Sequence, residues 1–148
     1  MQDNAIAPTP EIAPLRIRLA AMVYEALLVT AVLFVASFII LPLVGELEFA
    51  WQRLLFQGYL LLVLFGYFYA FWRKSGQTLA MKTWRIRLVN TAGGRLNLPQ
   101  ASIRFGVAVA GVLLGGAGLW WALFDRDHQF LHDRLAGTRL IRLPRTRE

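Results

Sequence analysis

The chain has 148 residues, of which 57% are hydrophobic, and a net charge of +7. This composition excludes an ordinary soluble domain, because the apolar residues gather into three long runs with the charges between them, as in a chain embedded in a bilayer. The basic residues flank these runs, which favours anionic lipid headgroups rather than nucleic acid as their partner. The lack of cysteine excludes disulfides and thiolate metal sites.

A polar lead with three prolines, residues 1–14, is predicted to be flexible. The apolar run that follows predicts an uncleaved transmembrane helix over residues 19–41, since it is too long for the apolar core of a signal peptide. Arg18 lies at the start of this helix, and Glu25 follows two turns later on the same face, about 10.5 Å along the axis. A carboxylate is unfavourable in lipid, so we expect Glu25 to face protein, as a proton or cation site or as a structural polar contact.

The second apolar run predicts a transmembrane helix over residues 54–72, which ends in aromatic residues typical of a membrane interface. The next segment, residues 73–104, contains seven basic residues and no acidic one. The loop of residues 46–53 contains two acids and one base. By the positive-inside rule the basic segment and the amino terminus are cytoplasmic, which predicts a multi-pass membrane protein.

The basic segment contains signals for local structure. Thr78 is a candidate N-cap for a short amphipathic helix from which Lys82 would reach lipid phosphates. Polar and apolar residues alternate over residues 85–89 and again over residues 95–98, with a turn at residues 90–94 between them. This pattern predicts a small cytoplasmic β-hairpin.

The third apolar run, residues 105–124, is rich in glycine, and two arrangements fit it. It forms either a straight third crossing or a re-entrant segment that turns near Gly115 and Gly116. A straight crossing would place the arginine-rich tail outside, against the charge bias. Residues 137–143 alternate like a further strand for the hairpin.

Three separated segments carry a common pattern. The first is Arg-Leu-Ala-Ala at residues 18–21 followed by the acid Glu25, the second is Gly-Gln-Thr-Leu-Ala-Met-Lys at 76–82, and the third is Leu-His-Asp-Arg-Leu-Ala-Gly-Thr-Arg-Leu-Ile at 131–141. Together they resemble the RDD family of bacterial membrane proteins over about residues 15–142. Glu25 stands where that family usually has Asp. The resemblance implies an inner-membrane protein with a proposed role in transport, and it implies no substrate.

The resemblance also singles out site residues. Its charged positions are Arg18, Glu25 and Asp133. If the tail is cytoplasmic, Asp133 is expected to pair with Arg18 at the same membrane face. The supporting motif residues are Gly76, Thr78, Lys82, His132, Gly137 and Thr138.

The sequence gives little support for a metal site, a cofactor site or an enzyme active site. His128 and His132 have the spacing of half a zinc site on a helix, but the further ligands of such a site are missing, so we expect no metal. Residues 76–82 lack the second glycine and the Lys-Ser/Thr pair of a phosphate-binding loop, so we expect no nucleotide or other cofactor. No nucleophile with a base and an orienting acid is evident, so we do not expect an enzyme.

We therefore expect an all-α membrane protein with two or three transmembrane helices and a small cytoplasmic β-hairpin. Its membrane domain would cover residues 15–143, with a C-terminal motif at 125–143 and a tail at 144–148. The leading functional hypothesis is a small transporter or ion-coupled module that acts as a homo-oligomer or with a partner membrane protein. The alternative is a non-catalytic scaffold or accessory subunit that docks a protein partner.

Overall fold

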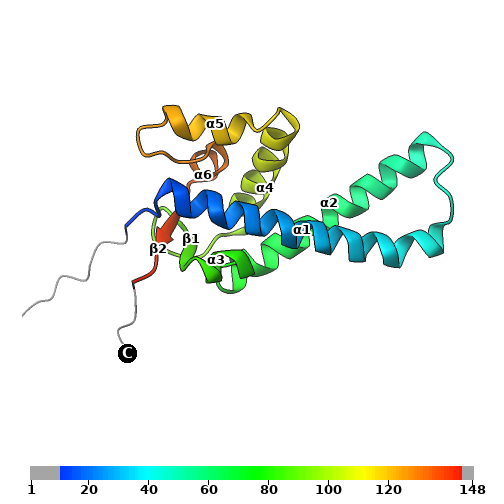
Figure 1. Ribbon diagram of the computed structural model, residues 1–148, viewed down its shortest axis with the longest axis horizontal. Coiled ribbons are helices and arrows are strands. Elements are labelled where there is room, and N and C mark those ends of the chain that lie inside the picture. The colour runs from blue at the N-terminus through cyan, green and yellow to red at the C-terminus, as the bar shows by residue number, and fades with distance from the viewer. Residues whose placement is uncertain (1–10, 145–148) are drawn as a thin grey trace, which may run out of the picture.

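Two long antiparallel helices form the elongated part of the molecule. The computed structural model describes residues 11–144, in which α1 (Leu15–Val44) and α2 (Ala50–Lys74) extend well beyond the other elements (Figure 1). Both helices are long and apolar enough to cross a membrane, which confirms the two predicted spans. Each exceeds its predicted bounds of 19–41 or 54–72 by a few residues, because a helix continues past the apolar run while its backbone hydrogen bonds remain satisfied.

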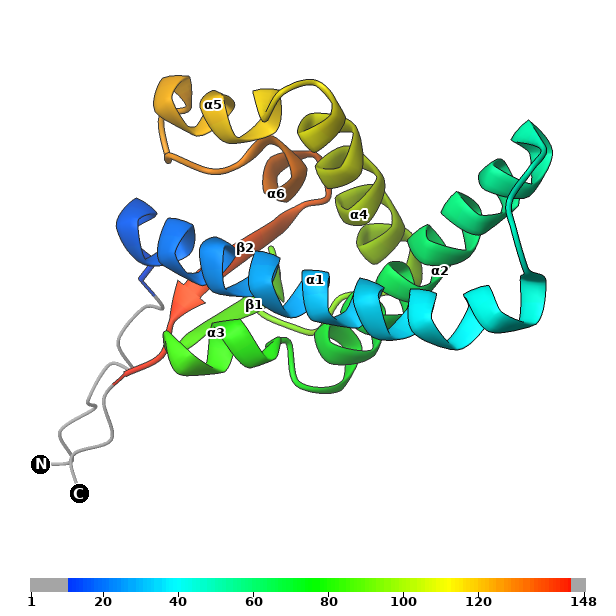
Figure 2. The ribbon, with the colours of Figure 1, turned by 45° about the vertical axis from the view of Figure 1, so that its right-hand side comes forward.

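The remaining elements gather around one end of this pair and are called the cap. The cap lies around the start of α1 and the end of α2, and it leaves the other end of the pair bare (Figures 1 and 2). In chain order its elements are α3 (Leu79–Thr83), β1 (Ile86–Asn90), α4 (Leu98–Leu113), α5 (Ala117–Phe124), α6 (Leu131–Leu135) and β2 (Thr138–Arg142).

The sheet of the cap is two-stranded and antiparallel, but it is not a hairpin. β1 pairs with β2, so that Leu88 lies opposite Leu140. The strands predicted over residues 85–89 and 137–143 therefore form, and they pair directly with each other. The strand predicted over residues 95–98 does not form, and the hairpin prediction is wrong in that respect.

A helix start takes the place of the missing strand. The Asn97 side chain accepts a hydrogen bond of 2.9 Å from the backbone N–H of Gln100, and the Gln100 side chain accepts one of 3.3 Å from the backbone N–H of Asn97. Together with Pro99 in the first turn, this capping box starts α4. The short alternation before it therefore belongs to a helix entry.

Residues 11–13 extend the edge of the sheet. Ile12 forms a bridge with Ile141, and a backbone hydrogen bond of 2.9 Å lies on each side of this bridge. The end of the predicted lead is thus part of the fold. Residues 1–10 of that lead and residues 145–148 of the predicted tail lie outside the described residues.

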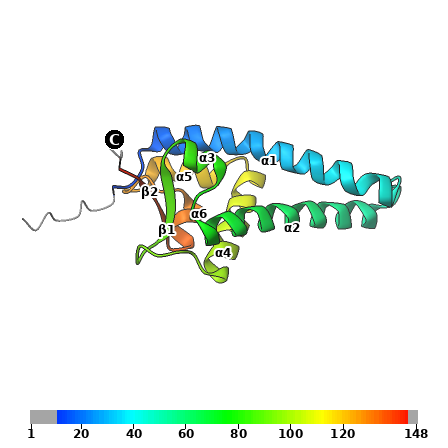
Figure 3. The same ribbon diagram turned by 90° about the horizontal axis from the view of Figure 1, so that it is seen from below.

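The third apolar run is bent. The axes of α4 and α5 differ by 100°, and the break between them contains Gly115 and Gly116 with φ of +70° and +83°. A single straight helix over residues 105–124 is therefore not formed, and the turn lies at the glycines that the re-entrant arrangement requires. Because β2 follows α5 and pairs with β1, the chain returns to the end of the molecule at which α4 begins (Figure 3).

The buried core lies in the cap, while the long helices expose their apolar side chains. Large hydrophobic residues such as Phe34, Phe38 and Leu62 are more than two-thirds exposed on α1 and α2. Such continuous apolar surface is unfavourable in water and matches lipid contact. The core cluster consists of Ala13, Ala21, Trp72, Met81, Ile86, Leu88, Leu96, Ala101 and Leu140.

Candidate functional site

Arg18 is buried in the first turns of α1. Its side chain is 2% exposed, its Nη2 donates a hydrogen bond of 2.5 Å to the backbone carbonyl of His128, and its guanidinium lies 5.1 Å from the ring centre of Phe130. Among residues 11–144, no carboxylate lies within ion-pair distance of Arg18. The predicted pair with Asp133 is therefore wrong.

Asp133 forms a buried ion pair with Arg104 instead. α6, which carries Asp133, packs on α4, which carries Arg104, so these two side chains meet inside the cap. The Thr138 hydroxyl at the start of β2 accepts a hydrogen bond of 3.3 Å from Arg104 and is 3.3 Å from the Asp133 carbonyl oxygen, to which it donates. The Trp72 ring centre lies 5.1 Å from the Arg104 guanidinium, so the pair joins α4, α6 and β2 beneath the end of α2.

Glu25 accepts hydrogen bonds from two other elements. The Tyr67 hydroxyl on α2 donates to its Oε1 at 3.0 Å, and the Thr78 hydroxyl donates to its Oε2. The same Thr78 oxygen accepts a bond of 3.3 Å from the backbone N–H of Met81 and thereby caps α3, as predicted. Glu25 thus faces protein, and its carboxylate connects α1, α2 and α3.

The turn before α3 is fixed against β1. Gly76 has φ of +69°, and a Cβ at this position would lie only 2.7 Å from the carbonyl oxygen of Leu88. The side-chain amide of Gln77 donates a bond of 2.8 Å to the carbonyl of Ile86. This turn therefore requires glycine and places Thr78 beside Glu25.

The other motif residues lie at different places in the cap. Lys82 is exposed on α3, and Gly137 has φ of +64° at the turn between α6 and β2. His132 is buried in α6, and its ring stacks on Phe130 with centres 5.4 Å apart. Burial lowers the pKa of His132 well below its ordinary value of 6.5, and the nearby Arg104 and Arg18 guanidinium groups lower it further. His132 is therefore neutral at pH 7.

His128 does not share a helix with His132. It precedes α6 in the loop from α5, and its Nδ1 lies 3.0 Å from the carbonyl of Ala122. Within residues 11–144 there is no group of three or more His, Asp or Glu side chains that could hold a metal ion.

Asp125 organises the loop between α5 and α6. Its Oδ2 accepts backbone N–H bonds from Gln129 at 3.1 Å and from Asp127 at 3.2 Å, and its Oδ1 lies 2.7 Å from the Arg134 guanidinium. The N–H of Gln129, followed by the charge of Arg134, holds the pKa of Asp125 below its ordinary value. This loop presents the His128 carbonyl to Arg18.

A cavity of about 420 Å³ lies where these groups meet, between α1, α2 and α4. Arg18, Glu25, Arg104 and His132 are its charged or titratable lining residues, and nearly all of its remaining lining is apolar. Its volume lies within the usual range for small-molecule sites. Arg18 and Glu25 therefore share one cavity, although no ion pair joins any two of Arg18, Glu25 and Asp133 within residues 11–144.

Several buried polar atoms around the cavity are unpaired. Nε of Arg18, Nε of Arg104, Nε1 of Trp72 and Oδ2 of Asp133 have no hydrogen-bond partner among the described residues. Buried polar atoms are nearly always satisfied, so each such atom requires an explanation. Here the two guanidinium groups with a free donor both line the cavity.

Sequence reasoning missed three of these partners. Arg104 is one of the seven basic residues of segment 73–104, although Asn97 and Pro99 mark a helix start that places it near the apolar run. Tyr67 belongs to the aromatic end of the predicted helix 54–72, and Asp125 belongs to the motif at 125–143, and neither pattern indicates a partner. No local signal in the sequence connects Tyr67 to Glu25, which is 42 residues away.

Comparison with known proteins gives one family match over most of the chain. The family model described as "RDD family" matches residues 12–137. An uncharacterized protein of Rickettsia prowazekii (strain Madrid E) is 34% identical over 83 residues, which cover 55% of this chain and 46% of that protein. The match thus spans less than half of the length of that relative. No solved structure matches the chain at a significant level.

Proposed function

The chain belongs to the RDD family, and from this premise we propose that it moves a small solute through a membrane in exchange with protons at Glu25. Family membership and two membrane-length helices make it a membrane protein. To this we add the proposal that the protein transports a solute. The observation that carries this step is the cavity in which Glu25 and Arg18 of α1 meet Arg104 of α4 among apolar walls.

The surroundings of Glu25 suit reversible protonation. Its two oxygens are held by the hydroxyls of Tyr67 and Thr78, and no arginine or lysine lies within ion-pair distance among residues 11–144. A hydroxyl can donate to a carboxylate and can also accept from a carboxylic acid. Glu25 can therefore gain or lose a proton while both hydroxyls stay in place, and a solute in the cavity would respond to its charge.

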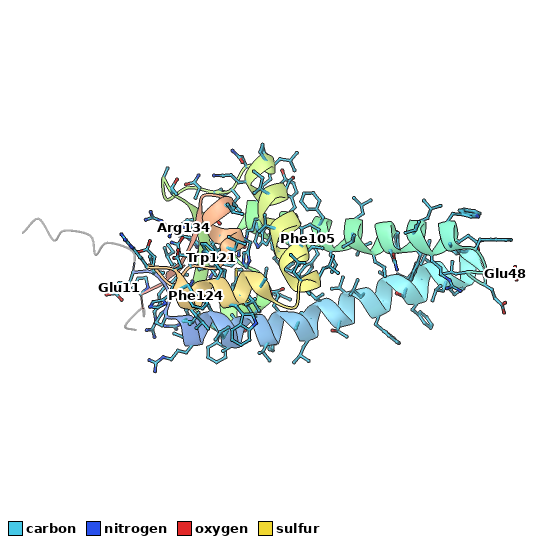
Figure 4. All side chains as sticks on the ribbon, turned by 90° about the horizontal axis from the view of Figure 1, so that it is seen from above. Glu11, Glu48, Phe105, Trp121, Phe124 and Arg134 are labelled. Carbon is cyan, nitrogen blue, oxygen red and sulfur yellow. The ribbon has the colours of Figure 1, made fainter. Side chains whose placement is uncertain are left out.

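The distribution of charge supports a cytoplasmic cap in the inner membrane. Figure 4 shows Glu11 and Glu48 at opposite ends of the molecule, with Glu11 at the cap end. Exposed arginines and lysines are concentrated at the cap end, which the positive-inside rule assigns to the cytoplasm. They are Arg16, Arg73, Lys74, Lys82, Arg85, Arg87, Arg95, Arg126, Arg134, Arg139 and Arg142.

A single copy does not enclose a pathway. The far halves of α1 and α2 have no other described element against them, and two helices by themselves cannot enclose a route for a solute. We therefore propose that the transporting unit is a homo-oligomer or includes a partner membrane protein.

Flux in proteoliposomes tests this proposal. Purified protein is reconstituted with a pH-sensitive dye inside the vesicles, and candidate solutes, with cations and small organic acids as separate arms, are added outside. We expect solute-dependent proton movement in the wild type and loss of this movement in Glu25→Gln, because the amide keeps the hydrogen-bonding shape and cannot exchange a proton. Glu48→Gln, at the opposite end of α1 and exposed, is the matched control and should behave as wild type.

Two outcomes would contradict the proposal. If Glu25→Gln retains full proton movement, Glu25 is not the exchange site. If no arm moves protons in any variant while the protein is monodisperse, the accessory or scaffold role is favoured over transport.

A further inference from the structure

We propose that the cavity binds an amphiphile with one anionic head, a carboxylate or a phosphate, and an apolar chain. This inference rests on the proposed function, because it names the class of solute that the same cavity would bind. Its support comes from the charge, the shape and the apolar walls of that cavity, one step at a time.

Two buried arginines supply positive charge to the cavity. Arg18 and Arg104 both line it, and both are at least 95% buried. Among residues 11–144, the only carboxylate paired with either of them is Asp133, which forms an ion pair with Arg104. Arg18 is therefore a buried cation without a carboxylate partner among the described residues, a state that an anion within hydrogen-bond reach would stabilise.

Donors for an anion are already present. Nε of Arg18 and Nε of Arg104 have no partner among the described residues, and guanidinium groups bind carboxylate and phosphate oxygens with well-matched geometry. Glu25 lies about 10.5 Å further along α1, and its oxygens are held by two hydroxyls. The charge that an anionic head would meet first is thus that of the arginines.

Apart from Glu25, the lining of the cavity beyond the arginines is nearly all apolar and extends along α1 and α2. From Arg18 to Val29, the lining face of α1 covers twelve residues, whose α-carbons span about 16 Å along the axis. On α2 the lining face from Trp72 back to Leu61 covers a similar length in the same direction, since the helices are antiparallel. This length is about half of the ~30 Å hydrocarbon core, so an apolar chain would extend from the arginines toward the middle of the bilayer.

α4 closes a further side with apolar residues. Phe105, Ala108, Val109 and Val112 line the cavity from this helix. A small inorganic anion would leave this apolar surface uncovered, and an uncharged alkane would leave the arginines unmatched. An anionic amphiphile would cover the apolar surface with its chain and would pair its head with the arginines.

Native mass spectrometry of the full chain tests this assignment. The protein is purified in a neutral polyoxyethylene detergent and mixed with dodecanoate, dodecyl phosphate or, as the oppositely charged probe, dodecyltrimethylammonium. We expect both anionic probes to be retained and the cationic probe not to be. If only dodecyl phosphate is retained, the ligand of the cavity has a phosphate head. If both anionic probes are retained to a similar extent, the cavity accepts any monoanionic head group.

Matched variants separate the charge from the apolar wall. Arg18→Gln should weaken retention of the anionic probes about tenfold or more, because a charge-assisted hydrogen bond is lost. Arg16→Gln removes the same charge from an exposed position on the same helix and should retain them as wild type. Ala108→Trp, which fills the cavity without changing any charge, should abolish retention, whereas Ala110→Trp on an exposed position of α4 should not.

The inference is overturned if the cationic probe is retained as well as the anionic ones, or if folded Arg18→Gln and Ala108→Trp both keep the anionic probes. It is also overturned if the cavity is filled by a second copy, seen as a dimer that excludes every probe and that Ala108→Trp dissociates. Failure of this inference is separable from failure of the proposed function. Proton movement that needs Glu25 without probe retention contradicts only the ligand class, and retention without any flux contradicts only transport.

Discussion

At the scale of single residues, the charged groups divide into a structural pair and a cavity pair. Arg104 and Asp133 neutralise each other inside the cap, and Arg104 also reaches the cavity, where its Nε has no partner among the described residues. Arg18 and Glu25 have no ion-pair partner among the described residues and both line the cavity. A buried pair fixes one arrangement of its elements, whereas unpaired charges at a cavity remain available to a ligand.

The structural pair predicts a large non-additive effect on stability. Asp133→Leu or Arg104→Met alone should lower the free energy of unfolding by about 3–5 kcal/mol, because each leaves a buried charge without its partner. The double variant Arg104→Met, Asp133→Leu should recover most of this loss. Denaturant unfolding of the purified protein measures all three.

An exposed ion pair in the same region provides the control. Asp127 is 3.5 Å from Arg134 and its side chain is 58% exposed, so Asp127→Asn should cost less than about 1 kcal/mol. If the losses of the two single core variants simply add in the double variant, the pair does not couple these elements.

His132 predicts a dependence of stability on pH. Its pKa is well below 6.5 in the folded chain, so the unfolded chain takes up a proton first as the pH falls. Stability should therefore decrease from about pH 6.5 downward, by up to about 1.4 kcal/mol per pH unit. His132→Gln should flatten this slope between about pH 6.5 and 5. His128→Gln, at an exposed position, should leave it unchanged, and thermal unfolding at several pH values makes the comparison.

At the scale of elements, short turns position the residues of the site. The turn before α3 holds Thr78 beneath Glu25, and the loop between α5 and α6 holds the His128 carbonyl against Arg18. Each turn is closed by side-chain bonds of its own, from Gln77 in the first and to Asp125 in the second. Arg18 and Glu25 on α1 therefore depend on two turns that lie far away in the sequence.

The first turn predicts a difference between two glycines with similar backbone angles. Gly76 and Gly93 have φ of +69° and +81°, but only at Gly76 would a Cβ meet a backbone atom, the Leu88 oxygen at 2.7 Å. Gly93→Ala should cost about 1–2 kcal/mol from the left-handed conformation alone. Gly76→Ala should cost clearly more, measured by denaturant unfolding. Equal losses would show that the turn moves freely away from β1.

At the scale of the whole molecule, pairing of β1 with β2 decides the topology. It brings both ends of the bent segment α4 and α5 to the cap end, so the chain after α5 does not emerge at the far end (Figure 3). The exposed apolar residues of α1 and α2 lie beyond the cap. The molecule is therefore a pair of antiparallel helices with the cap at one end.

Because the chain has no cysteine, labelling of single introduced cysteines tests this arrangement. In intact cells, a thiol reagent that does not cross the inner membrane should label Glu48→Cys and should not label Arg16→Cys, Arg95→Cys or Arg139→Cys. After permeabilisation all four should be labelled, since all four positions are exposed. Labelling of Arg139→Cys together with Glu48→Cys in intact cells would contradict the re-entrant topology.

The sequence by itself determined the elements that depend on neighbouring residues. The two long helices follow from uninterrupted apolar runs, and α3 follows from its Thr78 cap. The glycines at 115 and 116 allowed a bend, but the sequence left a straight crossing open as well, and only the structure shows the bend. The three motif segments, which lie far apart in the chain, identified the family. Each of these features is encoded within a stretch of about one element, where composition and spacing are sufficient.

Only the tertiary structure decided which distant residues meet. Alternation predicts a strand but not its partner, so it could not tell that β1 pairs with β2 instead of residues 95–98. Opposite charge likewise predicted Arg18 as the ion-pair partner of Asp133, whereas the packing of α6 on α4 brings Asp133 to Arg104. Attraction between charges acts on whichever groups the packed elements bring together, and that packing is set by burial across the whole cap. Arg18 is consequently left at the cavity with a free donor.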